Sequence, residues 1–389
     1  MEEGMEGHQH FLASTYAPVL DLLSKPLFSG ISEGKATLRL NTQVTHIDLA
    51  SNDQSPPLIA ITTSPTSSNP SAIYTSTFSA TLFCLPLGVL KHSHRTLFPL
   101  SPSPLSLPPR ALSAINSLGY GRLEKVYLRF ERAWWPHGAR IIMFLEDGNI
   151  KEASTTTSNP TNIPPQTQMT LVSLSCLPPP HAQPTLLFYL YGETSAALIR
   201  ALHSLSSTSI PSDPATNIIS PPPNSPQFTL LTTFFHPYLA RLHHSLIQPP
   251  GNQSQATTPT YTRTPTPTQI IHTTHTTSPF SGYGSYIYFP THAEDSESDV
   301  HILRNLGGKP HPHEAGGRDE GGEVEVEEVE EGWSSLPLWL SGEYVSPRKG
   351  LGTTAGAWWS GGEKAGRVRE WFEKGAKVGQ RSGTESRKK

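Results

Sequence analysis

Proline is the feature that most constrains how this chain can fold. The chain has 389 residues, of which 38 are proline, about twice the ordinary usage of about 5%. Hydrophobic residues make up 35% and charged residues 16%, both below the usual range for a globular protein. Proline interrupts helices and central strands, and polar segments bury too little apolar surface to offset their conformational entropy. The sequence therefore predicts folded segments, enough for two domains, separated by long polar stretches.

Charge and cysteine content exclude several classes of protein. The formal net charge is −3, so the chain lacks the basic footprint of a nucleic-acid-binding protein. Two cysteines, Cys84 and Cys176, cannot form a disulfide framework or a cysteine-rich zinc site, and they fit a reducing compartment. The acidic N-terminus does not resemble a signal peptide, and no apolar run reaches the roughly 20 residues that span a bilayer. We therefore expect no membrane segment and a cytoplasmic location.

Hydrophobic periodicity predicts the main helices and strands. Spacings of three to four predict a helix over 11–28, closed by Pro26 and Gly30, and a second helix opened by Pro108 and Pro109 and ended by Gly119. Alternating apolar and polar residues predict strands at 37–49, 74–84, 123–130, 141–145, 169–177 and 185–191. The last four predict a mostly antiparallel sheet of at least four strands in the middle of the chain.

Several stretches have compositions typical of loops. Ala153–Gln168, Ser204–Gln227 and Gln248–Thr277 are rich in Ser, Thr, Pro, Asn and Gln, which predicts disordered loops. Arg318–Glu331 holds eight carboxylates and one arginine, and we interpret it as a solvated acidic run rather than a Ca²⁺ site. Histidine pairs occur at 8/10, 92/94, 272/275 and 311/313. Their spacing varies and no Cys or carboxylate joins them as a repeated set, so we interpret them as surface histidines and expect no metal.

Two blocks of sequence, one at residues 85–136 and the other at 338–361, contain recognisable motifs. The first runs from Leu85-Pro86-Leu87-Gly88-Val89-Leu90 through Gly119-Tyr120-Gly121 to Trp134-Trp135-Pro136. The second comprises Leu338-Trp339-Leu340-Ser341-Gly342-Glu343 and the later segment 352–361, which begins Gly352-Thr353-Thr354. Together they resemble the flavin-containing amine oxidases, a family that includes polyamine oxidases, monoamine oxidases and lysine-specific histone demethylases. The resemblance is closest to the fungal polyamine-oxidase-like branch and covers roughly half of the chain.

The opening segment of that family has no counterpart in residues 1–36. The family begins with a strand, a G-x-G-x-x-G turn and a helix, whose backbone N–H groups approach the FAD pyrophosphate. Gly119-Tyr120-Gly121 and Gly282-Tyr283-Gly284 each lack the third glycine, so we do not interpret them as this turn. The chain thus resembles the C-terminal two-thirds of the family. Either the gene model starts late or the protein has lost its nucleotide-binding head.

The resemblance implies an α/β (α+β) fold. A partial FAD/NAD(P)-binding Rossmann-like domain would carry an inserted substrate domain built on a mostly antiparallel sheet, with long disordered insertions. The expected divisions are a partial FAD-binding domain at 1–95, a substrate-binding domain at 96–292, an acidic disordered insertion at 293–333, a C-terminal FAD-binding segment at 334–375 and a basic tail at 376–389.

The resemblance also implies which residues would hold FAD. The main chain of Val44 would bind the adenine. Gly342 and Glu343, after an apolar strand at 336–340, would lie at the ribityl–pyrophosphate region. Thr353, Thr354 and Gly356 would begin a helix whose N–H groups and dipole face the N1–C2=O edge of the flavin. Each position also has a plain structural interpretation: a strand valine, a surface glutamate and an ordinary threonine N-cap.

The substrate side is defined less fully by the sequence. Tyr286, with Tyr288 near it and Thr353 facing it, would form an aromatic wall that can stack on a cationic amine. A core aromatic is an equally weighted alternative for Tyr286. Many family members carry a lysine that holds a water near the flavin, and that position falls at Ala111, beside Arg110, which always stays protonated. No catalytic residue is therefore assigned.

The activity implied by the resemblance is that of an FAD-dependent, polyamine oxidase-like amine oxidase. A small amine would give hydride to the flavin, the imine would hydrolyse, and O2 would be reduced to H2O2. The alternative is a truncated, inactive family member that does not hold FAD stably, which the missing glycine turn and Ala111 favour. A desaturase-like flavin oxidoreductase is a third possibility, disfavoured by the Leu85–Leu90 block.

Overall fold

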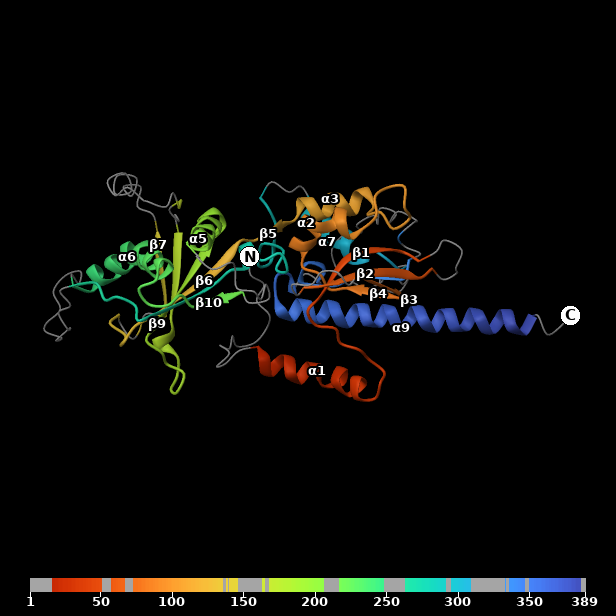
Figure 1. Ribbon diagram of the computed structural model, residues 1–389, viewed down its shortest axis with the longest axis horizontal. Coiled ribbons are helices and arrows are strands. Elements are labelled where there is room, and N and C mark those ends of the chain that lie inside the picture. The colour runs from red at the N-terminus through yellow and green to blue at the C-terminus, as the bar shows by residue number, and fades with distance from the viewer. Residues whose placement is uncertain are drawn as a thin grey trace, which may run out of the picture. The chain divides into compact units, whose positions relative to one another are not determined.

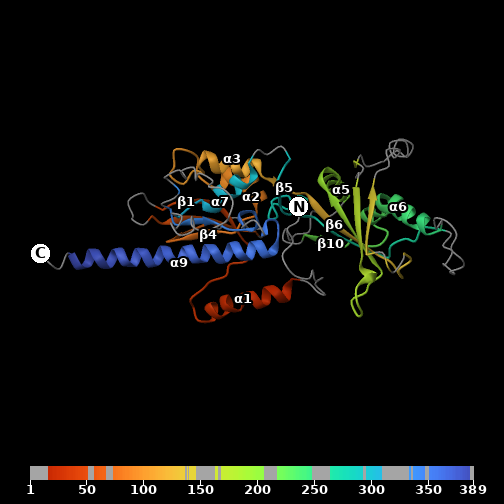
Figure 2. The same cartoon turned by 180° about the vertical axis from the view of Figure 1, so that it is seen from behind.

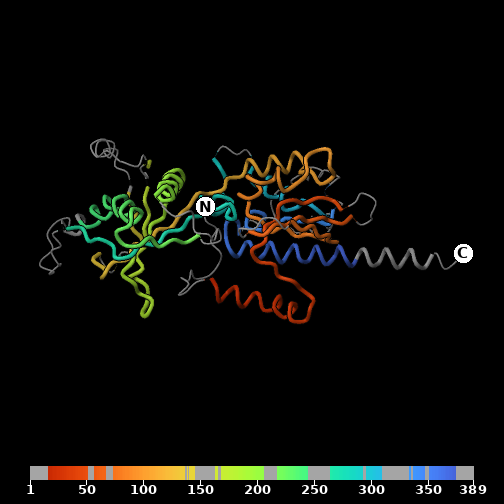
Figure 3. Tube along the Cα trace, viewed as in Figure 1, coloured from red at the N-terminus to blue at the C-terminus, as the bar shows by residue number. Residues whose placement is uncertain are grey.

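The structure is a computed structural model (Figure 1). It describes residues 16–50, 57–66, 73–135, 138, 140–145, 163–164, 168–205, 217–247, 263–291, 295–308, 333, 336–346 and 350–385. The chain divides into two compact units. The first comprises Met1–Gly119 and Tyr286–Lys389, and the second Tyr120–Ser285; Figure 3 traces the chain through both. This division places 96–119 with the first unit, whereas we expected these residues in the substrate domain.

The strands of the first unit form small sheets. The bounds are β1 (Thr42–Leu49), β2 (Ile59–Pro65), β3 (Tyr74–Phe78), β4 (Thr81–Phe83), β12 (Ile287–Tyr288) and β13 (Leu338–Leu340). β1, β2 and β3 form an antiparallel sheet, β13 pairs with β4 in parallel, and β12 pairs with β5 (Gly119–Tyr120). The mixture of helices and sheets agrees with the expected fold class, and the Rossmann-like description stays a prediction.

Helices flank these strands within the first unit. Their bounds are α1 (Ala17–Ser32), α2 (Leu87–Leu97), α3 (Pro109–Ser117), α7 (Ser296–Asn305) and α9 (Thr354–Glu385). α2, α3 and α7 lie on one side of β1 and β4, and α9 lies on the other (Figures 1 and 2). The loop after β13 forms the 3₁₀ turn η4 (Glu343–Val345), which contacts α7 and α9.

Several predicted boundaries in the first unit are wrong. α1 continues through Pro26 and Gly30 to Ser32, because Gly34, with φ 71°, is the glycine that ends it. The strand predicted from residue 37 begins only at Thr42, since Asn41 has φ 52° and interrupts extended backbone.

Two further predictions for the first unit need correction. The single strand predicted over 74–84 is divided between β3, which pairs with β2, and β4, which pairs with β13. Gly119 directly follows Leu118, the C-cap of α3, as predicted, but its φ is not positive, so a left-handed conformation is not the reason for glycine there. A Cβ atom built on it would lie 2.5 Å from the Tyr288 ring, so glycine is required there for close approach.

The second unit contains a six-stranded sheet of order β10-β11-β6-β9-β8-β7. Its strands are β6 (Leu123–Arg129), β7 (Ile141–Leu145), β8 (Gln168–Ser173), β9 (Thr185–Tyr191), β10 (Ile218–Ile219) and β11 (Gln269–Thr273). All neighbouring pairs are antiparallel, which confirms the predicted antiparallel sheet. The unit also contains α5 (Gly192–Ser204), α6 (Pro226–Ile247), η1 (Leu174–Cys176) and η2 (His275–Thr277).

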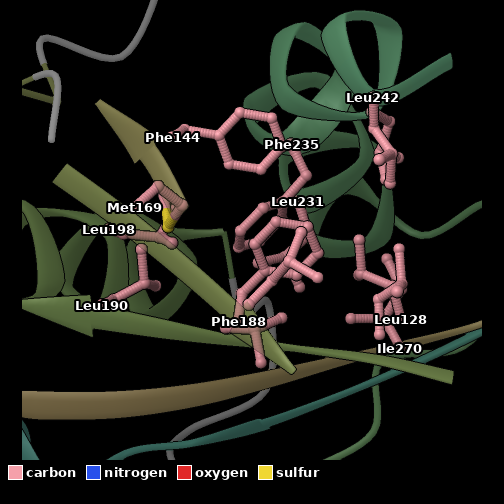
Figure 4. Packing of buried hydrophobic residues seen from close by; sticks show 14 of the residues in the cluster. Leu128, Phe144, Met169, Phe188, Leu190, Leu198, Leu231, Phe235, Leu242 and Ile270 are labelled. Carbon is pink, nitrogen blue, oxygen red and sulfur yellow. The ribbon is translucent and has the colours of Figure 1, made fainter. Parts of the chain in front are cut away.

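The core of the second unit is formed by the sheet together with α5 and α6 (Figure 4). Phe188 of β9 and Phe235 of α6 are fully buried, with ring centroids 4.6 Å apart. On β6, alternate residues are buried as predicted, but the buried set includes Glu124. Glu124 accepts hydrogen bonds from the hydroxyl of Thr273 and from the N–H and hydroxyl of Thr276, which compensates for its burial.

Parts of the predicted disordered stretches are ordered elements. Gln168 begins β8, Ile218–Ile219 form β10, and α6 begins at Pro226. Gln269–Thr273 form β11, because their isoleucines extend the sheet beside β6. Of the rest of these three polar stretches, the structure describes 163–164, 204–205, 217, 220–225, 263–268 and 274–277, and the remainder lies outside the described residues.

The predicted acidic insertion contains an ordered helix. Within 293–333, residues 296–305 form α7, capped by the Asp295 carboxylate, which accepts from the Ser298 N–H. The acidic run at 318–331 lies outside the described residues. α9 continues to Glu385, well into the predicted tail at 376–389. In the described part of the chain, no helix is both long and apolar enough to cross a membrane.

Candidate functional site

The start of α9 is fixed by a threonine cap. The Thr353 hydroxyl donates to the Gly350 carbonyl over 2.8 Å, and the Gly356 N–H donates to the Thr353 hydroxyl over 3.0 Å. This confirms the N-cap interpretation of Thr353. Thr354, the first residue of the helix, is exposed. The remaining N–H groups of the first turn lie at the positive end of a long helix dipole, where acceptor oxygens are favoured.

Two glycines let the first turn of α9 pack directly on the preceding loop. A Cβ atom on Gly356 would lie 1.8 Å from the carbonyl oxygen of Gly350. A Cβ atom on Gly350 would lie 2.6 Å from the Ser346 hydroxyl oxygen. Larger residues at either position would separate the helix from the loop. The structure therefore gives Gly356 a packing role, and its predicted contact with the cofactor stays a prediction.

Glu343 is half-buried beside this helix start. Burial raises the pKa of its carboxyl group to about 7, although the N–H groups of Ile287 and Gly352 act to lower the pKa. The Gly352 N–H lies 3.2 Å from Oε2. Glu343 is therefore not the surface glutamate of the alternative interpretation. Near neutral pH its carboxyl group is present in both protonation states, so it can accept or donate a hydrogen bond.

Gly342 lies two residues after the end of β13 and forms a hydrogen bond with α9. Its φ is 155°, a conformation that favours glycine, and a Cβ atom there would lie 2.7 Å from the Tyr344 ring. Its N–H donates to the hydroxyl of the buried Ser360, in α9, over 3.2 Å. The Tyr344 ring thus accounts for glycine at this position, and the predicted contact of Gly342 with the cofactor stays a prediction.

Tyr286 lies beside the loop that precedes α9. A Cβ atom on Gly352 would lie 3.6 Å from the Tyr286 ring and 3.5 Å from the carbonyl oxygen of Ile287. Tyr286 is 37% exposed and Tyr288 is 50% exposed, so neither is a core aromatic. The structure brings Tyr286, Glu343 and Thr353 together around Gly352. Their contact with a substrate stays a prediction.

Val44 belongs to a different sheet from these residues. It is half-buried in β1, opposite Thr63, and a register shift follows between Val44 and His46. Such a bulge leaves a main-chain group outside the ladder. The predicted main-chain contact of Val44 with adenine stays a prediction.

The position predicted for the family lysine offers no polar group. Ala111 is 1% exposed in α3, and its neighbour Arg110 forms an ion pair with Asp299 of α7 over 2.5 Å. In the described part of 120–285, the one lysine is Lys125 of β6, a residue that we assigned no role. Its Nζ atom lies 5.9 Å from the ring centroid of Tyr189.

The described histidines do not form a metal site. Among the residues described, no group of three or more His, Cys, Asp or Glu side chains could hold a metal ion. His272 is 1% exposed, so the surface interpretation of this histidine is wrong. Its Nδ1 atom lies 3.1 Å from the Thr273 carbonyl oxygen, and burial lowers its pKa. The pairs at 8/10 and 311/313 lie outside the described residues.

The donor set at the start of α9 fits the polar chain of a flavin nucleotide. It combines the N–H groups of a helix start, a carboxyl group with a raised pKa, and the buried hydroxyl of Tyr344, which has no hydrogen-bond partner in the described part of the structure. Hydroxyl and phosphate oxygens are suitable partners for such groups.

Four residues of this region were not predicted as site residues: Tyr344, Gly350, Gly352 and Ser360. The signal that could have indicated the tight loop before α9 is the pair of glycines at 350 and 352, the second of which directly precedes the threonine pair. Tyr344 and Ser360 gave no comparable signal, because their burial depends on the packing of η4 against α9.

Comparison with known proteins agrees with the sequence resemblance. A family model described as flavin containing amine oxidoreductase matches residues 3–201, just over half of the chain. "Probable polyamine oxidase 4" of Arabidopsis thaliana is 29% identical over 136 residues, which cover 35% of this chain and 22% of that protein. The family match includes the Leu85–Leu90 block and ends before Glu343 and Thr353. This chain belongs to the flavin-containing amine oxidoreductase family.

Proposed function

We propose that the chain is an FAD-dependent amine oxidase that acts on polyamine-like substrates and uses O2 as the electron acceptor, forming H2O2. Family membership supports a flavin cofactor and amine chemistry. The name of the Arabidopsis thaliana relative, a probable polyamine oxidase, supports the polyamine class. The observation that carries the proposal is the grouping of Glu343, Thr353 and Tyr286 around Gly352 at the start of α9.

On the cofactor side, the protein would supply position and polarity. The flavin, when bound, accepts electrons from an amine and passes them to O2. The first-turn N–H groups of α9 would stabilise negative charge on an oxygen or ring edge near them. Glu343 would hold a hydroxyl group of the ribityl chain in place, since its carboxyl group is half-buried and its pKa is about 7.

On the substrate side, Tyr286 supplies an accessible aromatic ring. The ring is 37% exposed and borders the Gly352 loop. An aromatic face attracts ammonium groups, and a polyamine carries several of them. The Tyr286 ring would therefore orient one end of a polyamine while another of its amine groups reacts.

Two glycine variants test the placement of the cofactor. Gly352 and Gly34 both have φ 71°, so alanine is strained equally at both, by about 1–2 kcal/mol. Only at Gly352 would the new methyl group lie next to Tyr286 and Ile287, because no atom of the described residues lies within 4 Å of a Cβ atom built on Gly34. We expect Gly352→Ala to weaken FAD binding about tenfold, measured by titration, and Gly34→Ala to leave it unchanged. Equal FAD binding by both variants would place the cofactor elsewhere, and no binding by the wild-type chain would support the inactive alternative.

A further inference from the structure

Tyr344 carries a buried hydroxyl group that no hydrogen bond engages within the described part of the chain. The residue lies in η4, directly after Glu343, and its side chain is 0% exposed. Its ring packs against Gly342, where a Cβ atom would lie 2.7 Å away. The hydroxyl oxygen has no hydrogen-bond partner among the residues that the structure describes. Buried tyrosine hydroxyls normally have a partner, because burial without one is costly.

The polar groups near Tyr344 are already engaged with other groups. Glu343 accepts from the Gly352 N–H over 3.2 Å. The Ser341 and Ser360 hydroxyls lie 3.2 Å from each other, and the Cys84 thiol hydrogen-bonds with Ser341. Among the residues that the structure places, these neighbours thus have partners and the Tyr344 hydroxyl has none.

The chemistry of this hydroxyl group indicates what kind of partner it needs. Burial, together with the negative forms of Cys84 and Glu343 nearby, raises the pKa of Tyr344 far above its usual range. The phenol therefore keeps its proton at all physiological pH values and is available as a donor. A donor requires an acceptor oxygen, and the neighbouring Gly342 and Glu343 are where we expect the ribityl–phosphate chain of the flavin.

We propose that the Tyr344 hydroxyl is a further cofactor-binding group, which donates a hydrogen bond to an oxygen of the ribityl–phosphate chain of the flavin nucleotide. This inference rests on the proposed function. It makes a claim about one hydroxyl group that family membership does not supply, and it explains why this buried group has no partner among the described residues.

The test compares Tyr344→Phe with the wild type, using the full 389-residue chain with and without FAD. Phenylalanine keeps the ring that packs on Gly342 and removes only the hydroxyl group. Without FAD, we expect the urea midpoint of unfolding to stay the same or rise, because an unpartnered buried polar group is lost. With FAD, we expect the Kd to rise about five- to tenfold, because a donor to the cofactor is lost.

Tyr120→Phe is the matched control. The Tyr120 hydroxyl donates to the Ser281 carbonyl over 3.0 Å within the second unit. Its removal is expected to lower the unfolding midpoint with and without FAD alike and to leave the Kd unchanged. Both variants lose one tyrosine hydroxyl. We expect Tyr344→Phe to raise the Kd for FAD without lowering the unfolding midpoint, and Tyr120→Phe to lower the midpoint without changing the Kd.

Each outcome decides the question. An unchanged Kd for Tyr344→Phe would overturn the inference and leave the proposed function intact. A Tyr344→Phe chain that unfolds more readily without FAD, or fails to fold, would also overturn it, because the hydroxyl would then have a partner within the protein. A wild-type chain that binds no FAD would overturn the proposed function and this inference with it.

Discussion

At the scale of single residues, Glu343 carries the most information. Its carboxyl group is half-buried, and burial raises its pKa to about 7, while the N–H groups of Gly352 and Ile287 moderate the shift. The identity of this residue and its place after an apolar strand could be read from the sequence. Its protonation could not, because it depends on η4, the Gly352 loop and residue 287, which lie far apart in the chain.

The raised pKa of Glu343 makes a prediction about stability. Its usual pKa is about 4.5, so the folded chain holds this proton more tightly than the unfolded chain. The stabilisation that the protonated Glu343 carboxyl group contributes to the folded chain is complete below about pH 4.5 and is lost as pH rises through 7. The unfolding free energy of the wild type, relative to Glu343→Gln, should therefore fall across this range by up to about 3 kcal/mol, less any solvent screening.

Urea unfolding of both chains from pH 4.5 to 8 measures this difference. Glu373→Gln is a suitable control, because Glu373 is exposed on the same helix, α9. The control should track the wild type within about 0.5 kcal/mol at each pH, as exposed surface changes usually do. A Glu343→Gln difference that does not vary with pH would contradict the assignment.

At the scale of elements, the start of α9 requires glycine for close packing, whereas the middle of the helix does not. Gly356 is buried against Gly350, whereas Gly362 is exposed, and no atom of the described chain lies within 4 Å of a Cβ atom built on it. Gly356→Ala should destabilise the chain by at least about 1–3 kcal/mol, because its methyl group meets backbone. Gly362→Ala should stabilise it by about 0.5–1 kcal/mol, because alanine favours helix. Equal effects in urea unfolding would contradict the close packing of this helix start.

The same scale shows what local sequence could and could not predict. The family resemblance implied a helix that begins at Thr353 and Thr354, and α9 begins at Thr354. Helix α1, by contrast, continues through Pro26, and its end is set by the backbone of Gly34. β11 was hidden in a polar stretch, because two isoleucines form a strand only when β6 is available as a partner.

At the scale of the whole chain, each unit has its own packing. The buried cluster formed by the six-stranded sheet together with α5 and α6 is made only of residues from the second unit. We therefore expect residues 120–285, produced alone, to unfold in one cooperative transition. Phe188→Ala in this segment should cost about 3–5 kcal/mol, since its ring is fully buried against Phe235. A segment without a cooperative transition would show that this core needs the rest of the chain.

The candidate site was also predictable only in part at this scale. Glu343, Thr353 and Tyr286 were expected near one cofactor, and the structure groups them around Gly352. Val44 lies in the separate β1–β2–β3 sheet. The Tyr344 hydroxyl became visible only from the packing, because its isolation results from which neighbours already have partners.

The visible absorption spectrum of the purified 389-residue chain, after incubation with FAD and desalting, tests the central claim most directly. The account predicts a retained flavin spectrum that bleaches when spermine or spermidine is added under nitrogen and returns when air is admitted. A colourless protein, or a flavin spectrum that neither amine bleaches, would contradict the claim that this chain is an amine oxidase.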